Sequence, residues 1–181
     1  MSDQLAAALR DRLGARFTDV RASMPQHATA RYGSLNSANL VGIAVHHSAA
    51  PREQTPAAIA DYHITHNGWA GIGYHLVIRQ GQVHYVGSIA TARAHVSGRN
   101  HELIGICITG DYTQTAPRTE DTTALRDVIA ALDAHLGRTL RVDGHNGWAL
   151  AGHGTACPGA LAPIARAIRG GVPAPQPGTV Q

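Results

Sequence analysis

The chain has 181 residues, a length typical of one domain that can bury a core without disulfides or structural metals. Its formal net charge is +3, and all fifteen basic residues are arginines scattered along the chain, without the basic stripe of a nucleic-acid-binding surface. No apolar run approaches the roughly 20 residues of a membrane span. We therefore expect one soluble domain that binds no nucleic acid and has no stable membrane insertion.

Residues 1–39 are predicted to form a helix followed by an irregular arm. Apolar side chains recur at helical spacing over 4–15 and form one stripe. The stretch 18–39 mixes proline, glycine, serine and asparagine without a clear period, so we expect no regular element there. The start of the chain does not combine a positive leader, an apolar block and a small-residue cleavage site, and we expect no secretory signal.

The following residues predict alternating strands and helices. Short β-branched runs predict buried strands, and two of them flank a hairpin turn at Gln80 and Gly81. Thr55 and Pro56 predict the start of a helix, and Thr119 is the expected N-cap of a second one. The predicted strands are 40–47, 74–79, 82–86, 103–109 and 138–144, the predicted helices are 56–67, 119–135 and 161–170, and 144–159 is a predicted loop.

These elements predict the α/β fold class. Strands alternate with helices, but the hairpin makes the sheet mixed, so we expect a single domain with a central mixed β-sheet flanked by helices over 40–169. The segment 170–181 is rich in proline and glycine and is expected to be a disordered tail.

Two histidines and a cysteine follow the ends of predicted strands. His46 lies at the carboxyl end of the first strand, opposite its β-branched residues; His145 follows a later strand, and Cys157 lies in the same loop. Two imidazoles and a thiolate with an open fourth position form a typical catalytic zinc site. The alternative is that the histidines are satisfied polar residues and the cysteine a small buried hydrophobe. Because Cys107 lies in a predicted buried strand, we expect both cysteines to be reduced.

Five sequence blocks carry a resemblance to a known family. VGIAVHHSA, GWAGIGYHLVIRQGQV, AHVSGRNHELIGICITGDY, VDGHNGW and GTACPG occur in that order within 40–169. Together they resemble the type 2 N-acetylmuramoyl-L-alanine amidases, which include phage lysins and the peptidoglycan recognition proteins. The resemblance implies their amidase-like fold and cleavage of the amide between N-acetylmuramic acid and the L-alanine of the stem peptide.

The resemblance also implies roles for single residues. His46, His145 and Cys157 match the ligands of one Zn²⁺ per chain. Tyr74 matches the tyrosine beside the metal-bound water, and Thr155 falls where relatives carry lysine or threonine. Both hydroxyls would be catalytic, because neutral donors of this kind can stabilise the oxyanion of a tetrahedral intermediate.

Three further residues are candidates for substrate binding. His95 and Asn100 lie in the matching block AHVSGRN, and Trp69 lies in GWAGIGYH. The alternatives are an exposed loop position for His95 and a packing role for Trp69. Cys107 falls where another branch of the family carries glutamate, so the resemblance implies no charged acid or base at that position.

Two departures from the family pattern leave alternatives open. The stretch between the second histidine and the cysteine is longer than in relatives and supplies His153, which could replace His145 as a ligand; we favour His145 because it directly follows the strand. His47 neighbours a predicted ligand on a strand and therefore points to the other face, so we expect a structural role for it.

The expected function is that of a zinc-dependent peptidoglycan hydrolase, a phage endolysin acting as a monomer on peptidoglycan. It would stay in the host cytoplasm before lysis and then act on the cell wall or periplasm. The alternatives are a bacterial cell-wall recycling amidase, a non-catalytic peptidoglycan-binding module of the same fold, and a zinc ion that only ties the last loop to the sheet. Retention of all three ligand positions and the tyrosine favours the enzyme.

Overall fold

A mixed sheet of six strands flanked by helices confirms the expected α/β fold class for the described part of the chain. A computed structural model describes residues 4–169, and the predicted tail 170–181 lies outside them. The strands follow the order β1-β4-β3-β5-β2-β6, and every neighbouring pair is parallel except the β3–β4 hairpin. Their bounds are β1 Phe17–Asp19, β2 Gly42–His47, β3 Leu76–Arg79, β4 Gln82–Tyr85, β5 Leu103–Ile108 and β6 Arg141–Gly144.

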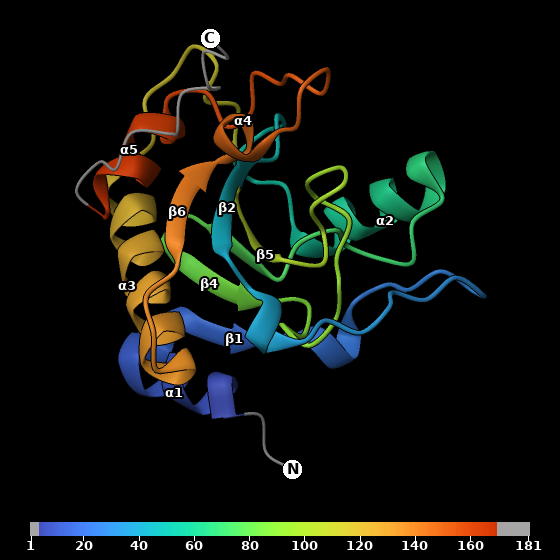
Figure 1. Ribbon diagram of the computed structural model, residues 1–181, viewed down its shortest axis with the longest axis horizontal. Coiled ribbons are helices and arrows are strands. Elements are labelled where there is room, and N and C mark those ends of the chain that lie inside the picture. Colours follow the sequence, from blue (N-terminus) through green and yellow to red (C-terminus); the bar gives the residue numbers. More distant parts are fainter. Residues whose placement is uncertain (1–3, 170–181) are drawn as a thin grey trace, which may run out of the picture.

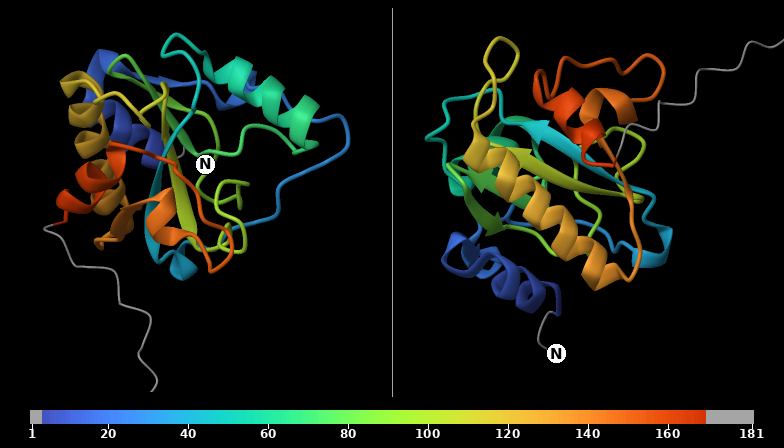
Figure 2. Two further views of the ribbon diagram at one scale, coloured as in Figure 1. Left: turned by 90° about the horizontal axis from the view of Figure 1, so that it is seen from above. Right: turned by 90° about the vertical axis from the view of Figure 1, so that its left-hand side faces the viewer.

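Helices cover the two faces of the sheet unequally. Figures 1 and 2 show α1, α3 and α5 packed along one face and α2 on the opposite face. Within the described part of the chain, no helix combines the length and the hydropathy that crossing a membrane would require. The helices are α1 Gln4–Leu13, α2 Pro56–Asn67, α3 Thr119–Leu136, α4 His145–Trp148 and α5 Leu161–Ala167, with 3₁₀ turns at Gly14–Arg16, Arg21–Ser23 and Ser37–Asn39.

Alternation along the strands separates a core face from a polar face. In β2, Ile43 and Val45 join the main apolar core, whereas Ala44 and His46 occupy the other face. The main core fills the space under α1, α3 and α5. Its fully buried members include Leu5 and Leu9 of α1, Leu125, Val128 and Leu132 of α3, Leu161 and Ala165 of α5, and Ile104, Ile106 and Ile108 of β5.

The predicted helix 56–67 is confirmed together with both of its end signals. The Thr55 hydroxyl oxygen accepts a hydrogen bond from the Ala58 backbone N–H at 3.2 Å, and Pro56 is the first helical residue. Gly68 ends the helix with a φ of 67°, a left-handed conformation that glycine adopts without steric cost.

The prediction of an irregular arm over 18–39 is wrong at its start. Phe17–Asp19 forms β1, an edge strand parallel to β4. The strand is only three residues long and two of its side chains are exposed, so it has no hydrophobic period to detect. Helix α1 docks on α3, and in the turn after α1 the Arg16 guanidinium donates a 2.8 Å hydrogen bond to the Asp127 carboxylate of α3. The N-terminal segment thus packs on the main core.

Other helix predictions also differ from the structure: α1 ends at Leu13 rather than at residue 15, α3 ends at Leu136 rather than at His135, and two further differences are larger. Arg118, not Thr119, occupies the N-cap position of α3, and no side chain caps this end. The expected acidic residue of the first turn, Asp121, is fully buried: it accepts hydrogen bonds from the Gly81 backbone N–H and from Arg52, and so fixes the hairpin turn on the helix. The predicted loop 144–159 begins with the short helix α4, which tertiary contacts hold in place.

Candidate active site and metal centre

Three side chains from separate parts of the chain converge at the carboxyl edge of the sheet. His46 lies near the end of β2, His145 begins α4, and Cys157 lies in the loop before α5. One ligand atom from each of them lies within 4.8 Å of the others, and Sγ of Cys157 is 3.8 Å from Nδ1 of His46. The structure therefore brings together the three residues that the sequence pattern singled out.

The sheet register explains why the two histidines meet. β2 and β6 are parallel neighbours with Val45 opposite Gly144, so His46 and His145 follow paired positions. The loop then returns to this edge, because the Asn146 backbone N–H donates to the Cys157 carbonyl at 2.9 Å. Strand pairing thus places the histidines, and one backbone hydrogen bond holds the cysteine beside them.

A buried tryptophan anchors α4, the helix that carries His145. The Trp148 indole N–H donates to the Ile43 carbonyl at 3.0 Å, and its ring lies where a Cβ on Gly42 would be. Arg141 stacks on the ring with its guanidinium carbon 4.3 Å from the ring centroid. The position of His145 therefore depends on a packing contact with β2.

Burial keeps the three candidate ligands in their neutral forms. Burial, followed by repulsion from His95 and His145, lowers the pKa of His46 well below its usual value, and burial also lowers the pKa of His145. Burial raises the pKa of the Cys157 thiol to about 11. Neutral imidazoles offer lone pairs to a cation, and a bound cation would release the thiol proton.

The donor set fits a zinc ion. Tetrahedral zinc with Zn–S near 2.3 Å and Zn–N near 2.0 Å separates sulfur from nitrogen by about 3.5 Å. The 3.8 Å between Cys157 Sγ and His46 Nδ1 matches this edge, and borderline-soft N and S donors are the usual ligands of zinc. Three protein ligands leave a fourth position for water or substrate.

Two hydroxyl side chains border the same site. The Tyr74 ring lies 5.1 Å from the His46 ring, and burial raises the Tyr74 pKa well above its usual value, so the phenol stays neutral. The Thr155 oxygen accepts a hydrogen bond from the Cys157 backbone N–H at 3.1 Å, which leaves the hydroxyl hydrogen available to another acceptor. Both residues line the hollow in which the three candidate ligands lie.

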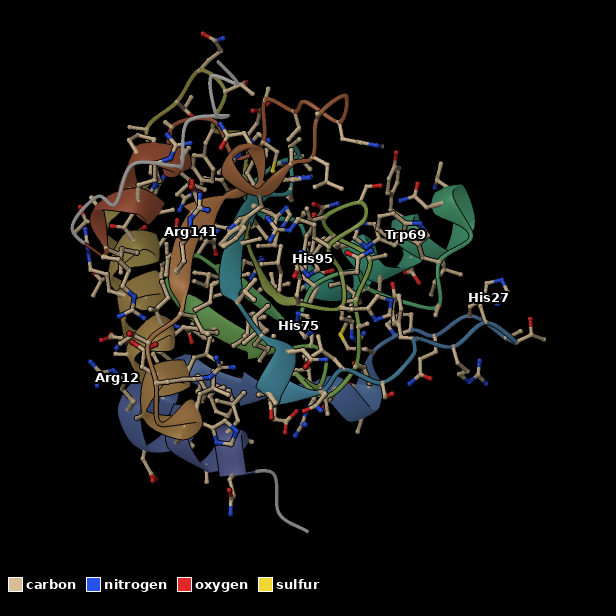
Figure 3. The ribbon with its side chains drawn as sticks, in the orientation of Figure 1. Arg12, His27, Trp69, His75, His95 and Arg141 are labelled. Atoms are coloured by element: carbon tan, nitrogen blue, oxygen red, sulfur yellow. The ribbon has the colours of Figure 1, made fainter. Side chains whose placement is uncertain are left out.

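Two adjoining hollows of about 560 and 450 Å³ form a groove over the candidate ligands. In Figure 3, His95 lies between β2 and α2, and Trp69 lies beside α2; both line the groove. The described residues that line the groove include no arginine, aspartate or glutamate, so it can hold an uncharged group without leaving a charge unpaired. Shared by both hollows are Trp69, Ala94, His95, His145 and Thr155.

The structure also locates the residues that the sequence left open. His153 lines the outer hollow, and the group of candidate ligands among residues 4–169 contains His145 instead. The His47 ring turns away from this group and its Nδ1 accepts a hydrogen bond from the Tyr112 backbone N–H at 3.0 Å. Cys107 is a free, buried thiol that packs in one apolar cluster with Tyr74.

Sequence reasoning missed the closeness of His63 to the site. Its ring lies 5.5 Å from that of Tyr74, and its Nδ1 accepts the Gly73 backbone N–H at 3.0 Å. The available signal in the sequence was helical spacing: Ile59 and His63 are one turn apart on α2, so both lie on the side of the helix that faces the sheet.

Comparison with known proteins identifies the family. Residues 36–160 match the model of the family described as N-acetylmuramoyl-L-alanine amidase. The chain belongs to this amidase family. The match covers more than two thirds of the chain and contains the three candidate ligands, so the resemblance seen in the sequence blocks is confirmed. The chain matches none of the curated proteins with which it was compared.

Solved structures of amidases and recognition proteins share the fold. The Ph2119 endolysin from a Thermus scotoductus bacteriophage is 26% identical with a TM-score of 0.67, and the match covers 86% of this chain and 99% of that one. The endolysin amidase LysCS from Clostridium intestinale is 25% identical with a TM-score of 0.58, over 75% and 88% of the two chains. Drosophila peptidoglycan recognition protein SD is 19% identical with a TM-score of 0.73, over 83% and 94%, which supports the fold alone.

Proposed function

We propose that the protein is a zinc-dependent amidase that cleaves the bond between N-acetylmuramic acid and the L-alanine of the stem peptide. The observation that carries this proposal is the cluster of His46, His145 and Cys157 at the floor of an open groove, with Tyr74 and Thr155 beside it. A ligand set with an open position and two neutral hydroxyl donors suits the hydrolysis of an amide.

The roles of the residues follow from their contacts. When bound, zinc supplies Lewis acidity that polarises the scissile carbonyl and lowers the pKa of water to about 7. The Tyr74 hydroxyl stays protonated and can donate to the oxygen that becomes negative in the transition state. The Thr155 hydroxyl can do the same, because its oxygen accepts from the Cys157 N–H and its hydrogen can be donated to another acceptor.

The proton for the leaving amine has few routes through this chain. The described residues around the candidate ligands include no lysine, arginine, aspartate or glutamate. The Tyr74 hydroxyl, which lines the same hollow and stays protonated, would therefore carry the proton to the nitrogen of the departing L-alanine.

Peptidoglycan is the proposed partner, and the neutral groove supports it. An uncharged glycan and a peptide amide can be held by hydrogen bonds and by stacking on Trp69. His95 and Asn100 line the same groove and were the other candidates for substrate binding. We further propose that the protein is a phage endolysin, which its likeness to the Ph2119 endolysin supports. We propose in addition that it acts as a monomer and is held in the host cytoplasm until it reaches the cell wall.

A second candidate function is a peptidoglycan-binding module without catalysis, which the fold shared with recognition protein SD supports. Insoluble peptidoglycan separates the two candidates. We expect incubation with the zinc-loaded protein to release new amino groups with time, whereas Cys157→Ser should sediment with the wall and release none. Sedimentation without amine release by both proteins would establish the binding module. A muropeptide lacking intact glycan strands would then distinguish a recycling amidase, which should cut it as fast as the polymer.

A further inference from the structure

His95 contacts the candidate zinc ligand His46 directly. The two rings meet edge to face, with Nδ1 of His95 lying 3.2 Å from Nε2 of His46. The other nitrogen of His95, Nε2, lies 3.3 Å from the carbonyl oxygen of Leu103. Both ring nitrogens of His95 therefore have partners within the protein.

These contacts fix where the hydrogens lie. A carbonyl oxygen can only accept, so the hydrogen of a neutral His95 sits on Nε2 and its Nδ1 is an acceptor. The contact with His46 then requires a hydrogen on Nε2 of His46. The lone pair of His46 is consequently on Nδ1, the atom that lies 3.8 Å from the Cys157 sulfur.

The surroundings hold His95 in this position. The Asn100 side-chain oxygen accepts hydrogen bonds from the backbone N–H groups of His95 and Val96, both at 2.9 Å, and so closes the loop that carries the ring. Gly105 lies under the ring, and a Cβ there would come within 2.8 Å of the His95 Cγ atom. The loop and the strand are thus both shaped around the imidazole.

We propose that His95 is a positioning residue that fixes the tautomer and ring orientation of His46 before the metal binds. This inference rests on the proposed function, since it assigns a purpose to the lone pair on His46 Nδ1. It gives His95 a part in metal binding in place of a contact with substrate, and it gives Asn100 the part of holding the His95 loop. Groups that hydrogen-bond to a metal-ligating histidine typically affect metal affinity by about 10- to 100-fold.

The tautomer can be measured directly in the metal-free wild-type protein. In ¹⁵N-histidine NMR spectra we expect His46 and His95 each to carry a hydrogen on Nε2 and none on Nδ1. A hydrogen on His46 Nδ1, or rapid exchange between its two tautomers, would overturn the proposal. This NMR measurement needs neither zinc nor catalysis, so its result tests the tautomer even if the protein proves not to be an amidase.

Variants test the consequence for the metal. His95→Phe keeps a ring but offers no acceptor, and we expect it to weaken zinc binding by about 10- to 100-fold in competition with a chromophoric chelator. His95→Asn can return an acceptor oxygen near Nδ1 and should recover most of that loss. His84→Asn is the control, because His84 is a partly buried histidine of β4, a strand that β3 and β5 separate from β2 and its His46.

The outcomes separate positioning from simple packing. Weaker zinc binding in His95→Phe, recovery in His95→Asn and no change in His84→Asn would establish the role. Equal zinc affinity in His95→Phe and wild type, or an equal loss in His84→Asn, would show that His95 only fills space. If His95→Phe fails to fold, the comparison of His95→Asn with wild type and the tautomer measurement still decide.

Discussion

The Sγ atom of Cys157 lies 3.8 Å from Nδ1 of His46, although 111 positions of sequence separate the two residues. Neither residue has an acidic neighbour that would explain this approach as an ion pair. The pair is instead held by strand β2 on one side and by the backbone hydrogen bond between Asn146 and Cys157 on the other. A soft donor beside an imidazole donor, both neutral and mostly shielded from water, is an arrangement that a zinc ion would stabilise.

Cys157→Ser should remove zinc and activity while leaving the fold intact. The serine oxygen is a poorer zinc ligand than a thiolate, and we expect zinc affinity to fall by more than about 100-fold. Zinc content by elemental analysis and the melting temperature in chelator measure the two effects separately. A zinc ion that merely tied the loop to the sheet would instead make wild-type protein lose its melting temperature in step with its activity on chelation.

Tyr74→Phe should slow catalysis without loss of metal. The change deletes one neutral donor at the site, and the loss of such a donor typically lowers kcat by about 10²- to 10³-fold. Steady-state rates of amine release give kcat and KM, and we expect KM and zinc content to match those of wild type. A variant as fast as wild type would remove Tyr74 from the catalytic residues.

Thr155 should matter through its hydroxyl rather than its methyl group. Thr155→Val removes both the acceptor for the Cys157 N–H and the donor at the site, so kcat should fall and zinc should bind more weakly. Thr155→Ser retains the hydroxyl and should stay close to wild type in both. Chelator competition and kinetics on the two variants give the comparison, and equal behaviour of valine and serine would contradict the assignment.

Acid should destabilise the metal-free protein partly through His63. Burial lowers the pKa of His63 to about 4, below the value of about 6.5 in an unfolded chain. As the pH falls, the unfolded state therefore takes up the proton before the folded state does. The contribution of the neutral His63 to the free energy of unfolding is present above pH 6.5 and is lost as the pH falls towards 4, on the order of 3 kcal/mol in all. His63→Asn keeps an acceptor for the Gly73 backbone N–H, and it should make the free energy of unfolding in urea less dependent on pH across that window. An unchanged pH dependence would show that the loss of stability in acid does not come from His63.

Gly42→Ala should disturb the metal site from a distance. The added Cβ would overlap the Trp148 ring, which anchors the helix carrying His145. Overpacking of this kind costs about 1–3 kcal/mol, and the displaced helix should also weaken zinc binding. Gly33→Ala is the matched control because a Cβ there meets nothing within 4 Å. Equal unfolding free energies and equal zinc affinities for the two variants would contradict the role of Trp148.

Much of the fold could be predicted from local signals. The helix over 56–67 has a side-chain cap, a proline at its start and a glycine at its end, and all three act as expected. Strand β1 and helix α4 could not be predicted, because each is only three or four residues long and owes its conformation to contacts with distant parts of the chain. The docking of Trp148 on β2 is one such contact.

The candidate site was predictable in part. His46 lies near the end of one strand and His145 directly follows another, and the pairing of these strands brings them together, so their types and positions were informative. The contact between His46 and His95 was not, because it depends on a loop shaped by Asn100 and on the space above Gly105, neither of which leaves a periodic signal. The sequence blocks therefore indicated which residues form the candidate site, whereas the hydrogen bonds of the structure indicate how their side chains are oriented.

Mass spectrometry of purified peptidoglycan after digestion tests the central claim most directly. We predict that the zinc-loaded protein releases stem peptides with a free L-alanine amine and leaves intact glycan strands, and that both a chelator and Cys157→Ser abolish this release. Undigested peptidoglycan, fragments cut within the glycan or within the peptide, or release that persists in chelator would contradict the assignment of a zinc amidase.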